Sequence, residues 1–447
     1  MAYPDPNSKS AALYRRACSV MPGGNTRNQS FIPPHHLYAD RAAGCRIWDV
    51  DGVERVDFVN NYTVTILGHG HPDVVRALER QVSRLVSTAL PTEFEIELAE
   101  TICRRGPHLE KVRFANTGTE AVMHAIKAAR AYTDRPRIVK CEGAYHGSYD
   151  YAEVSLDSNP QNWGQDAPNT VPFSRGVPKG ILDDMIIIPF NDPDTAERIL
   201  SRHDDDVAAV LLDLAPSRCG GIPASPAFLK VIDDFRKRTR ALVIADEVVS
   251  FRMRRGGAQE MLGFRADLTT LGKIVGGGMP VGAIAGSAEV MQVFDSTKGK
   301  ALVPQSGTFT ANPLSMIAGI KTLQIFDGSA IDRLNALGET ARNQLREAIR
   351  LADVPGQVNG EASLVLVTFS EEPILNYRSI YRGTDNLHQR LMRALFYGLL
   401  NRGIFFSSWG LASLSTPMEQ AEIDRLSQAV LETLREARDE VLMKASA

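Results

Sequence analysis

The stretch from Leu268 to Ala283 combines a single lysine with apolar residues and glycines. Lys273 follows Leu271-Gly272, and three consecutive glycines begin three residues later. An ammonium group among apolar neighbours is poorly solvated, so we expect the pKa of Lys273 to fall. Such a lysine can act as a nucleophile or form a Schiff base with a carbonyl compound. The alternative is a lysine before a flexible surface turn, and this stretch taken alone favours that alternative.

A second segment, Asn116-Thr117-Gly118-Thr119-Glu120, stands at the start of a predicted helix. The apolar positions of that helix are Ala121, Val122, Ala125, Ile126 and Ala129. Free amides at a helix N-terminus, two hydroxyls and a glycine favour an anion, most plausibly a phosphate. The alternative is an ordinary helix cap by Asn116 or Thr117. No Walker motif or GxGxxG pattern accompanies the segment, so a nucleotide triphosphate or a dinucleotide is not favoured.

Aromatic and charged side chains follow several predicted strands. Tyr145 and His146 lie in a glycine-flanked turn, where the ring of Tyr145 could stack on a planar ligand or lie in the core. Asp213 and Asp246 each follow an apolar strand. A carboxylate such as Asp246 in an apolar setting needs a cation, which a protonated ring nitrogen or an arginine would supply. Together with Lys273 and the anion segment, these groups describe a site for pyridoxal phosphate.

The elements around these residues predict an α/β protein. From about residue 90 to 325 strands and helices alternate, which indicates a mainly parallel sheet covered by helices on both faces. Ligands of such sheets bind beyond the carboxyl ends of the strands. We divide the chain into an N-terminal segment, 1–65, a large domain, 66–325, and a smaller α+β domain, 326–447. The stretch 157–177 is rich in Asn, Pro, Gly and Ser and predicts a long loop at the wall of the site.

Composition excludes several classes of protein. The chain has 447 residues, of which 44% are hydrophobic and 23% charged, and its net charge of −3 gives no general attraction for nucleic acid or an anionic membrane. Its five cysteines are widely spaced and predict free thiols in a reducing compartment. We find no apolar run of membrane-spanning length and no secretory signal, so we expect a cytoplasmic protein.

From Met21 to about residue 435 the chain closely resembles the class III aminotransferases of fold type I. The motifs that carry this resemblance stand in the same order: Trp48-Asp49-Val50-Asp51-Gly52, Gly68-His69-Gly70-His71-Pro72, Asn116 to Ala121, Tyr145-His146-Gly147, Asp246-Glu247-Val248, Leu271-Gly272-Lys273, and Gly307-Thr308-Phe309 with Asn312-Pro313. The resemblance implies a seven-stranded large domain and a smaller domain built from both termini.

Carried over position by position, the resemblance also implies roles for single residues. Lys273 would bind pyridoxal 5′-phosphate as a Schiff base and then carry the proton of the reaction, and Asp246 would keep the ring nitrogen protonated. Thr308 would reach the phosphate from a second subunit, which implies a homodimer with shared sites. The remaining cofactor-binding residues would be Thr117, Gly118 and Thr119 at the phosphate, Tyr145 and Val248 on the two ring faces, and His146 and Asp213 nearby.

Two subgroups look similar: glutamate-1-semialdehyde aminomutases and β-amino acid (β-phenylalanine) aminotransferases. Arg27 has the spacing at which the second subgroup binds the substrate carboxylate; the alternative is a surface arginine. The sequence departs from both patterns at Trp409, where the β-amino acid enzymes carry a second arginine, and it lacks the glutamate of the aminomutases in that segment. Asp213-Leu214 also replaces the usual Glu-Pro. Trp409 is either a pocket residue for an apolar substrate or a core residue.

We therefore expect a pyridoxal phosphate-dependent transaminase that works by a ping-pong cycle. An aminomutase or an amino acid racemase would use the same residues. A metal-dependent hydrolase using His69, His71, Asp246 and Glu247 is a weaker hypothesis, because the histidines lack a zinc-binding spacing, and we expect no metal site. A non-catalytic relative that only binds the cofactor is the last alternative.

Overall fold

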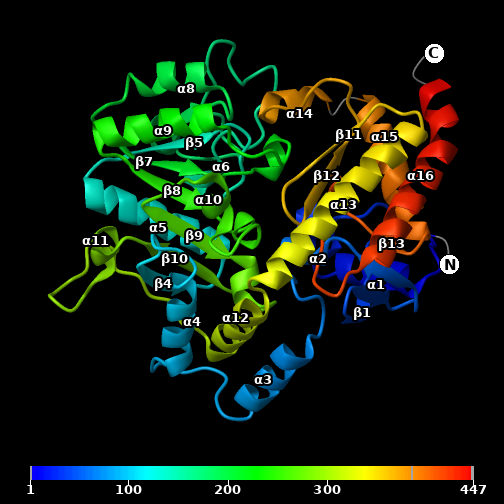
Figure 1. Cartoon of the computed structure of the whole chain (residues 1–447), viewed down its shortest axis with the longest axis horizontal. Helices are drawn as coiled ribbons and strands as arrows, with labels where there is room; N and C mark the ends of the chain where they lie inside the picture. The colour runs from blue at the N-terminus through cyan, green and yellow to red at the C-terminus, as the bar shows by residue number, and fades with distance from the viewer. Residues whose placement is uncertain (1–2, 384–385, 444–447) are drawn as a thin grey trace.

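The computed structural model describes residues 3–383 and 386–443, which form two lobes (Figure 1). The larger lobe contains a seven-stranded sheet in the order β4-β10-β9-β8-β7-β5-β6. Only β10 runs antiparallel to its neighbours, so the predicted mainly parallel sheet is confirmed. The strands are β4 (Lys111–Ala115), β5 (Arg137–Cys141), β6 (Met185–Ile188), β7 (Val207–Leu212), β8 (Leu242–Asp246), β9 (Leu268–Gly272) and β10 (Gly282–Gly286).

Helices cover both faces of this sheet, which is why β6 and β7 are apolar throughout rather than alternating with polar residues. All residues of β6, β7 and β8 are buried. Alternate side chains enter two different cores: Ile187 packs with α5, whereas Ile186 and Ile188 pack with α8 and α9. The helices of this lobe are α3 (Pro72–Val82), α4 (Glu93–Cys103), α5 (Gly118–Thr133), α6 (Asp150–Glu153), α7 (Lys179–Asp183), α8 (Pro193–Leu200), α9 (Pro226–Thr239), α10 (Gly257–Leu262), α11 (Ala288–Met291) and α12 (Pro313–Ile325).

The second lobe joins the two ends of the chain. In its four-stranded sheet β3 (Glu54–Asp57) pairs in parallel with β13 (Ile404–Phe405), next to β2 (Arg46–Asp49) and β1 (Ala39–Ala43). A three-stranded sheet consists of β11 (Gln357–Asn359), β12 (Leu364–Thr368) and β14 (Leu411–Ser413). Its helices are α1 (Lys9–Cys18), the turn α2 (Asn60–Thr63), α13 (Ser329–Leu351), α14 (Tyr377–Gly383), α15 (Asn386–Asn401) and α16 (Gln420–Met443).

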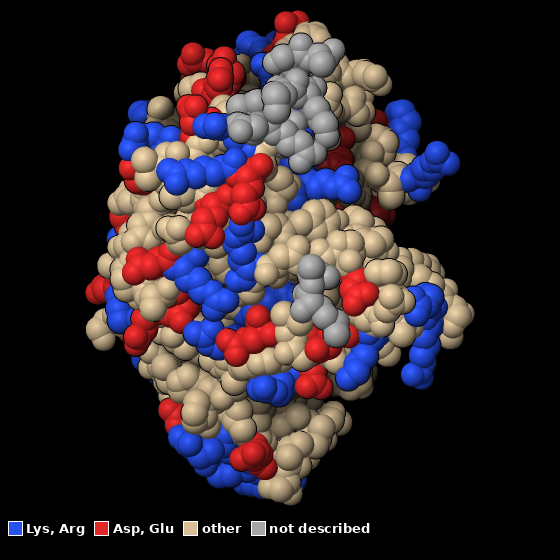
Figure 2. All heavy atoms as spheres, turned by 90° about the vertical axis from the view of Figure 1, so that its right-hand side faces the viewer, with Lys and Arg blue, Asp and Glu red and all other residues tan. Residues whose placement is uncertain are grey.

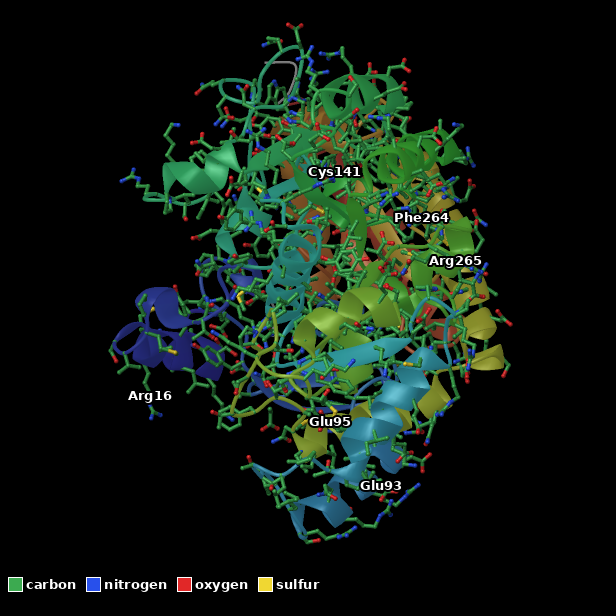
Figure 3. The ribbon with its side chains drawn as sticks, turned by 90° about the vertical axis from the view of Figure 1, so that its left-hand side faces the viewer. Arg16, Glu93, Glu95, Cys141, Phe264 and Arg265 are labelled. Atoms are coloured by element: carbon green, nitrogen blue, oxygen red, sulfur yellow. The ribbon has the colours of Figure 1, made fainter. Side chains whose placement is uncertain are left out.

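Several local predictions are confirmed. Strands β2 and β3 form the antiparallel hairpin expected at Asp51-Gly52. The segment 157–177 contains no helix or strand. All five cysteines are free thiols, and Cys141 ends β5 inside the larger lobe (Figure 3).

Among the described residues, no helix has both the length and the apolar character needed to cross a bilayer. Acidic and basic side chains are intermingled on the face shown in Figure 2.

Candidate active site

The predicted catalytic residues meet at one edge of the large sheet. Asp246 ends β8, Lys273 follows β9 directly, and Asp213 follows β7 directly. These three strands run parallel, so their carboxyl ends lie at the same edge. The three residues therefore stand in one site at this edge.

Lys273 stands in a strained backbone conformation. Its φ is +49°, a left-handed value that costs free energy in residues other than glycine. Its side chain is half-buried, and the residues that follow it, Ile274 and Val275, are buried. Burial lowers the pKa of Lys273, although the carboxylates of Asp246 and Asp213 oppose the shift. The surface-turn alternative for Lys273 is therefore wrong.

Asp246 is held by three donors. The side chain is 6% exposed, and its Oδ2 accepts a hydrogen bond of 2.8 Å from Nδ1 of His146. Its Oδ1 accepts from the hydroxyl of Thr270 and the amide of Val248, both at 3.1 Å. No arginine reaches this carboxylate among the described residues, so the arginine alternative is wrong. Burial lowers the pKa of His146, so its ring is neutral, and its buried Nε2 has no partner in the described part of the chain.

Asp213 has an unusual protonation state. Burial and the nearby charge of Asp246 raise the pKa of Asp213 to about 8. Its Oδ1 accepts from the amide of Ala215 at 2.9 Å. At neutral pH Asp213 is therefore a neutral carboxylic acid.

The start of α5 has the features of an anion site. Thr117 caps the helix by accepting from the amide of Glu120 at 3.1 Å, whereas Asn116 donates to the Glu120 carboxylate. The cap is thus Thr117 and not Asn116. In the described residues the amides of Gly118 and Thr119 have no protein partner. They are free donors at the positive end of a helix of 16 residues.

Val248 lies between two glycines. A Cβ on Gly118 would come within 3.0 Å of a Val248 methyl group, and one on Gly272 within 3.2 Å. These glycines therefore let the strand end, the helix N-terminus and Val248 pack closely.

Tyr145 lies on the turn after β5 and is 39% exposed, so it is not a core residue.

Arg27, the predicted substrate contact, lies against an unusual turn. Arg27 is exposed and donates from Nη1 to the side-chain oxygen of Asn61 at 2.8 Å. Asn61 belongs to α2, whose four residues all have φ between 50° and 76°. The turn is held by Asp57, which accepts from the amide of Asn60, and by the Asn60 side chain, which donates to the carbonyl of Ser413. Four successive left-handed residues that are not glycine are strained, and such strain accumulates at functional sites.

The same turn reaches the predicted pocket residue Trp409. The ring centroids of Tyr62 and Trp409 lie 5.8 Å apart at an interplanar angle of 33°. Trp409 is 37% exposed, so the core alternative for it is wrong. It lines a cavity of 540 Å³ together with residues that include Arg218, Leu366, Tyr377 and Leu411.

Asn61 and Tyr62, which contact Arg27 and Trp409, were not predicted from the sequence. The only signal for them was the Asn60-Asn61 pair, because asparagine tolerates the left-handed conformation better than most residues.

Thr308 is exposed and lines a different cavity, of 640 Å³, with the segment 87–91 and Glu95 of α4 (Figure 3). Within the described residues no cluster of His, Cys, Asp or Glu could hold a metal ion. His69 donates to Asp57 at 2.8 Å, and His71 accepts from the amide of Asp73 at the start of α3. Both histidines thus have roles in the fold.

Comparison with known proteins decides the family. The profile of the family described as aminotransferase class-III matches residues 29–432. The chain belongs to this family.

Relatives of this class III aminotransferase carry two kinds of name. A glutamate-1-semialdehyde 2,1-aminomutase of Methanothermobacter thermautotrophicus is 38% identical over 95% of this chain and 99% of its own. Among solved structures, an omega-transaminase from Sphaerobacter thermophilus is 46% identical, with a TM-score of 0.95 over 98% of this chain and 99% of its own. A beta-phenylalanine aminotransferase from Variovorax paradoxus is 33% identical, with a TM-score of 0.84 over 95% and 93%.

This class III aminotransferase uses pyridoxal 5′-phosphate, and a transaminase solved with that cofactor bound is 41% identical to it. The residues present fit the group. Unpartnered amides at the start of α5 suit a phosphate in the described part of the chain, and the Asp246 carboxylate suits a protonated ring nitrogen. Lys273 follows the strand next to the one that Asp246 ends, and burial lowers the pKa of its amine. The buried Nε2 of His146 is a further acceptor that no side chain or backbone group of the described residues uses.

Proposed function

We propose that this aminotransferase moves an amino group from an amino acid or amine with an apolar or aromatic substituent, including β-amino acids, to a keto acid or aldehyde in a ping-pong cycle. The observation that carries this proposal is the hydrogen bond of the Arg27 guanidinium to Asn61, the neighbour of Tyr62, whose ring in turn contacts that of Trp409. A guanidinium suits a carboxylate, and an aromatic wall suits an apolar substituent. The names of the omega-transaminase and the β-phenylalanine aminotransferase support the same reading.

We assign the cofactor to the edge of the large sheet. When bound, pyridoxal phosphate supplies an electron sink for the negative charge that develops on the substrate carbon. The amides of Gly118 and Thr119 and the hydroxyls of Thr117 and Thr119 would bind the phosphate. Asp246 would hold a proton on the ring nitrogen, and Tyr145 and Val248 would bind the two ring faces.

Lys273 would carry the covalent attachment and the proton transfer at its Nζ. Because burial lowers its pKa, the amine is neutral in a larger fraction of molecules than a solvated lysine would be, and a neutral amine can accept a proton.

The carboxyl of Asp213 and the ring of His146 would complete the surroundings of the cofactor. The Nδ1 proton of His146 keeps the Asp246 carboxylate oriented.

The experiment that tests this proposal is an absorbance titration of the purified holoenzyme with α-, β- and ω-amino compounds. Transfer of an amino group to the cofactor removes its visible band at about 420 nm. We expect bleaching by apolar and aromatic donors in the wild type, and weaker bleaching by these donors in Trp409→Ala, with lysine and ornithine as polar comparison donors. Equal bleaching in both proteins would contradict the role of Trp409.

A second candidate function is an intramolecular amino transfer, because a relative with 38% identity is named as an aminomutase. This candidate predicts a single isomeric product and no need for a separate acceptor. Product analysis with one amino compound and no keto acid separates the two functions: net conversion under these conditions would favour the aminomutase. A racemase would be recognised in the same assay by an enantiomer as the product.

We also propose that the enzyme is a homodimer in which Thr308 completes the partner's site. Thr308 is exposed, and apolar side chains are exposed on α3, α4 and the segment near Thr308, as an interface between copies would require. These side chains are Val75, Val82, Leu85, Val86, Leu90, Ile96 and Phe309.

The shared site can be tested by mixing Lys273→Ala and Thr308→Asp subunits. Each homodimer should be weakly active, whereas a mixed dimer has one intact site and should recover about half of the wild-type activity. Full activity of Thr308→Asp alone would contradict the role of Thr308.

We also propose that the chain divides into domains at residues 65 and 325 and that the protein is cytoplasmic.

A further inference from the structure

Glu142 is a buried carboxylate directly before the turn that carries Tyr145 and His146, and the proposed reaction does not use its charge. The residue is 1% exposed. Arg378 donates to both of its oxygens, from Nε to Oε2 at 2.6 Å and from Nη2 to Oε1 at 3.2 Å. Ser158 adds a hydrogen bond of 2.8 Å to Oε1. A bidentate guanidinium and carboxylate pair in a buried position holds both partners in one geometry.

Arg378 reaches Glu142 from the far end of the chain. It lies on α14, 236 residues away in sequence, and Figure 1 shows α14 at the junction of the two lobes. Its guanidinium also donates to the carbonyls of Trp163, at 2.7 Å, and Gly164, at 2.9 Å, and lies 4.9 Å from the ring centroid of Trp163. One side chain therefore fastens α14, the segment 157–177 and the end of β5 together.

Two further contacts fix the base of the turn. Tyr377, the neighbour of Arg378, packs so closely on Gly143 that a Cβ there would lie 2.0 Å from its ring, and its hydroxyl donates to the carbonyl of Ser158 at 2.7 Å. Arg218 donates from Nε to the carbonyl of Gly143 at 3.1 Å. Gly143 has a φ of +73°, which fits the absence of a side chain at this contact.

We propose that Arg378 is a positioning residue for the cofactor: through Glu142 it fixes the turn 143–147, so that Tyr145 stands ready to stack on the cofactor ring. This inference rests on the role of Tyr145 in the proposed function. A stacking residue that is already fixed loses little conformational freedom when the ring arrives, which favours binding. The same contacts make the segment 157–177 a fixed wall of the site and not a mobile lid.

The test is the rate of cofactor release from the holoenzyme, followed by the loss of its visible absorbance after gel filtration, together with its visible circular dichroism. We expect Arg378→Gln to release the cofactor about 10-fold faster and to weaken the dichroic signal, because the ring loses a fixed stacking partner. The release rate of Arg378→Lys should lie between the rates of Arg378→Gln and the wild type, since an ammonium group keeps the charge but not the bidentate geometry. Tyr145→Ala should accelerate release by itself.

A double variant separates a positioning role from a general loss of stability. If Arg378 acts through Tyr145, Arg378→Gln should change the release rate less than about 2-fold in the Tyr145→Ala background. Arg382→Gln is the matched control. Arg382 lies on the same helix and is exposed, with its guanidinium 5.7 Å from the Trp163 ring, and it makes no hydrogen bond or ion pair with the described residues. We expect the release rate of Arg382→Gln to equal that of the wild type.

The outcomes that overturn the two proposals are different. Unchanged release in Arg378→Gln, with faster release in Tyr145→Ala, would overturn the role of Arg378 and leave the proposed function intact. Unchanged release in Tyr145→Ala would overturn the stacking role on which both depend. If Arg378→Gln and Tyr145→Ala changed the release rate in a fully additive way, Arg378 would act without Tyr145, and the inference would be overturned. Should Arg378→Gln fail to fold, Ser158→Ala removes a single donor to Glu142 and should accelerate release in the same direction, and no acceleration there would overturn the inference.

Discussion

The cofactor side and the substrate side of this site are held by different kinds of backbone. Asp246, Lys273 and Asp213 stand at the ends of buried parallel strands, where the sheet fixes each position. Arg27 lies in an irregular loop, and its partner Asn61 lies in a left-handed turn. The groups that we assign to the reaction are thus placed by regular structure, and the groups that we assign to substrate selection by irregular structure.

The two sides differ equally in burial and bonding. Asp246 is 6% exposed and accepts three hydrogen bonds. Trp409 is 37% exposed and meets Tyr62 through a ring contact. This difference teaches that substitution of Lys273 or Asp246 should slow the reaction for every substrate, whereas substitutions on the substrate side should change the preference among substrates. Three predictions test that statement, beginning with the largest effect, and a fourth tests the raised pKa of Asp213.

Lys273→Ala should lower kcat for every donor by about a thousandfold or more, because no other group in the site can both attach the cofactor and carry the proton. The visible absorbance band should be lost at the same time. The measurement is steady-state turnover with a carboxylate donor and with a simple amine. Lys127→Ala, an exposed lysine of α5, is the control and should behave like the wild type. Activity within 10-fold of the wild type would refute the assignment.

Asp246→Asn should lower kcat by about 100-fold for every donor, with a smaller effect on KM. An amide keeps the shape and can still accept from His146, but it has no charge with which to hold a proton on the ring nitrogen. The ratio of kcat between carboxylate donors and simple amines should stay constant. A change in that ratio would show that Asp246 also acts on substrate selection and would break the comparison.

Arg27→Ala should raise KM for donors that carry a carboxylate by about 10- to 100-fold, which is the usual value of a charge-assisted hydrogen bond. Simple amines without a carboxylate should be affected little. Arg16→Ala is the control, because Arg16 lies on α1 with its side chain exposed (Figure 3). An equal rise in KM for both kinds of donor would mean that Arg27 supports the fold of the loop and does not bind the carboxylate.

Asp213→Asn should have the smallest effect, and one that depends on pH. The pKa of Asp213 is raised to about 8 from 3.8, so its protonated form stabilises the folded protein fully below about pH 4, and this stabilisation is lost as the pH rises to about 8. Asparagine mimics the protonated acid and has no such loss. Relative to the wild type, the cofactor-free variant should therefore gain at least about 1 kcal/mol in free energy of unfolding between pH 5 and pH 8.5, measured in urea. Parallel pH profiles would contradict the raised pKa.

Much of the cofactor side could be predicted from the sequence. The apolar strands before Asp213 and Asp246, and the glycines beside Lys273, have patterns that local chemistry explains. The partner of Asp246 could not be predicted in this way. Its donor, His146, lies 100 residues away, and only the order of the strands in the sheet brings the turn after β5 beside the end of β8.

On the substrate side the sequence named Arg27 and Trp409 but not the turn between them. Asn61 and Tyr62 were missed because their left-handed backbone is imposed by contacts from distant segments, among them Ser413. The same holds for Arg378, whose partner Glu142 is 236 residues away. No periodicity or motif in a single stretch encodes such pairs.

The sequence by itself determined the family, the alternation of strands and helices, and the residue types able to hold pyridoxal phosphate. It could do so because hydrophobic periodicity and turn chemistry act over short distances along the chain. The tertiary structure alone decided that the pKa of Asp213 is raised, which aromatic rings meet, and which arginine fastens α14 to the site. These properties depend on burial and on contacts between segments far apart in sequence, and both exist only once the chain has folded.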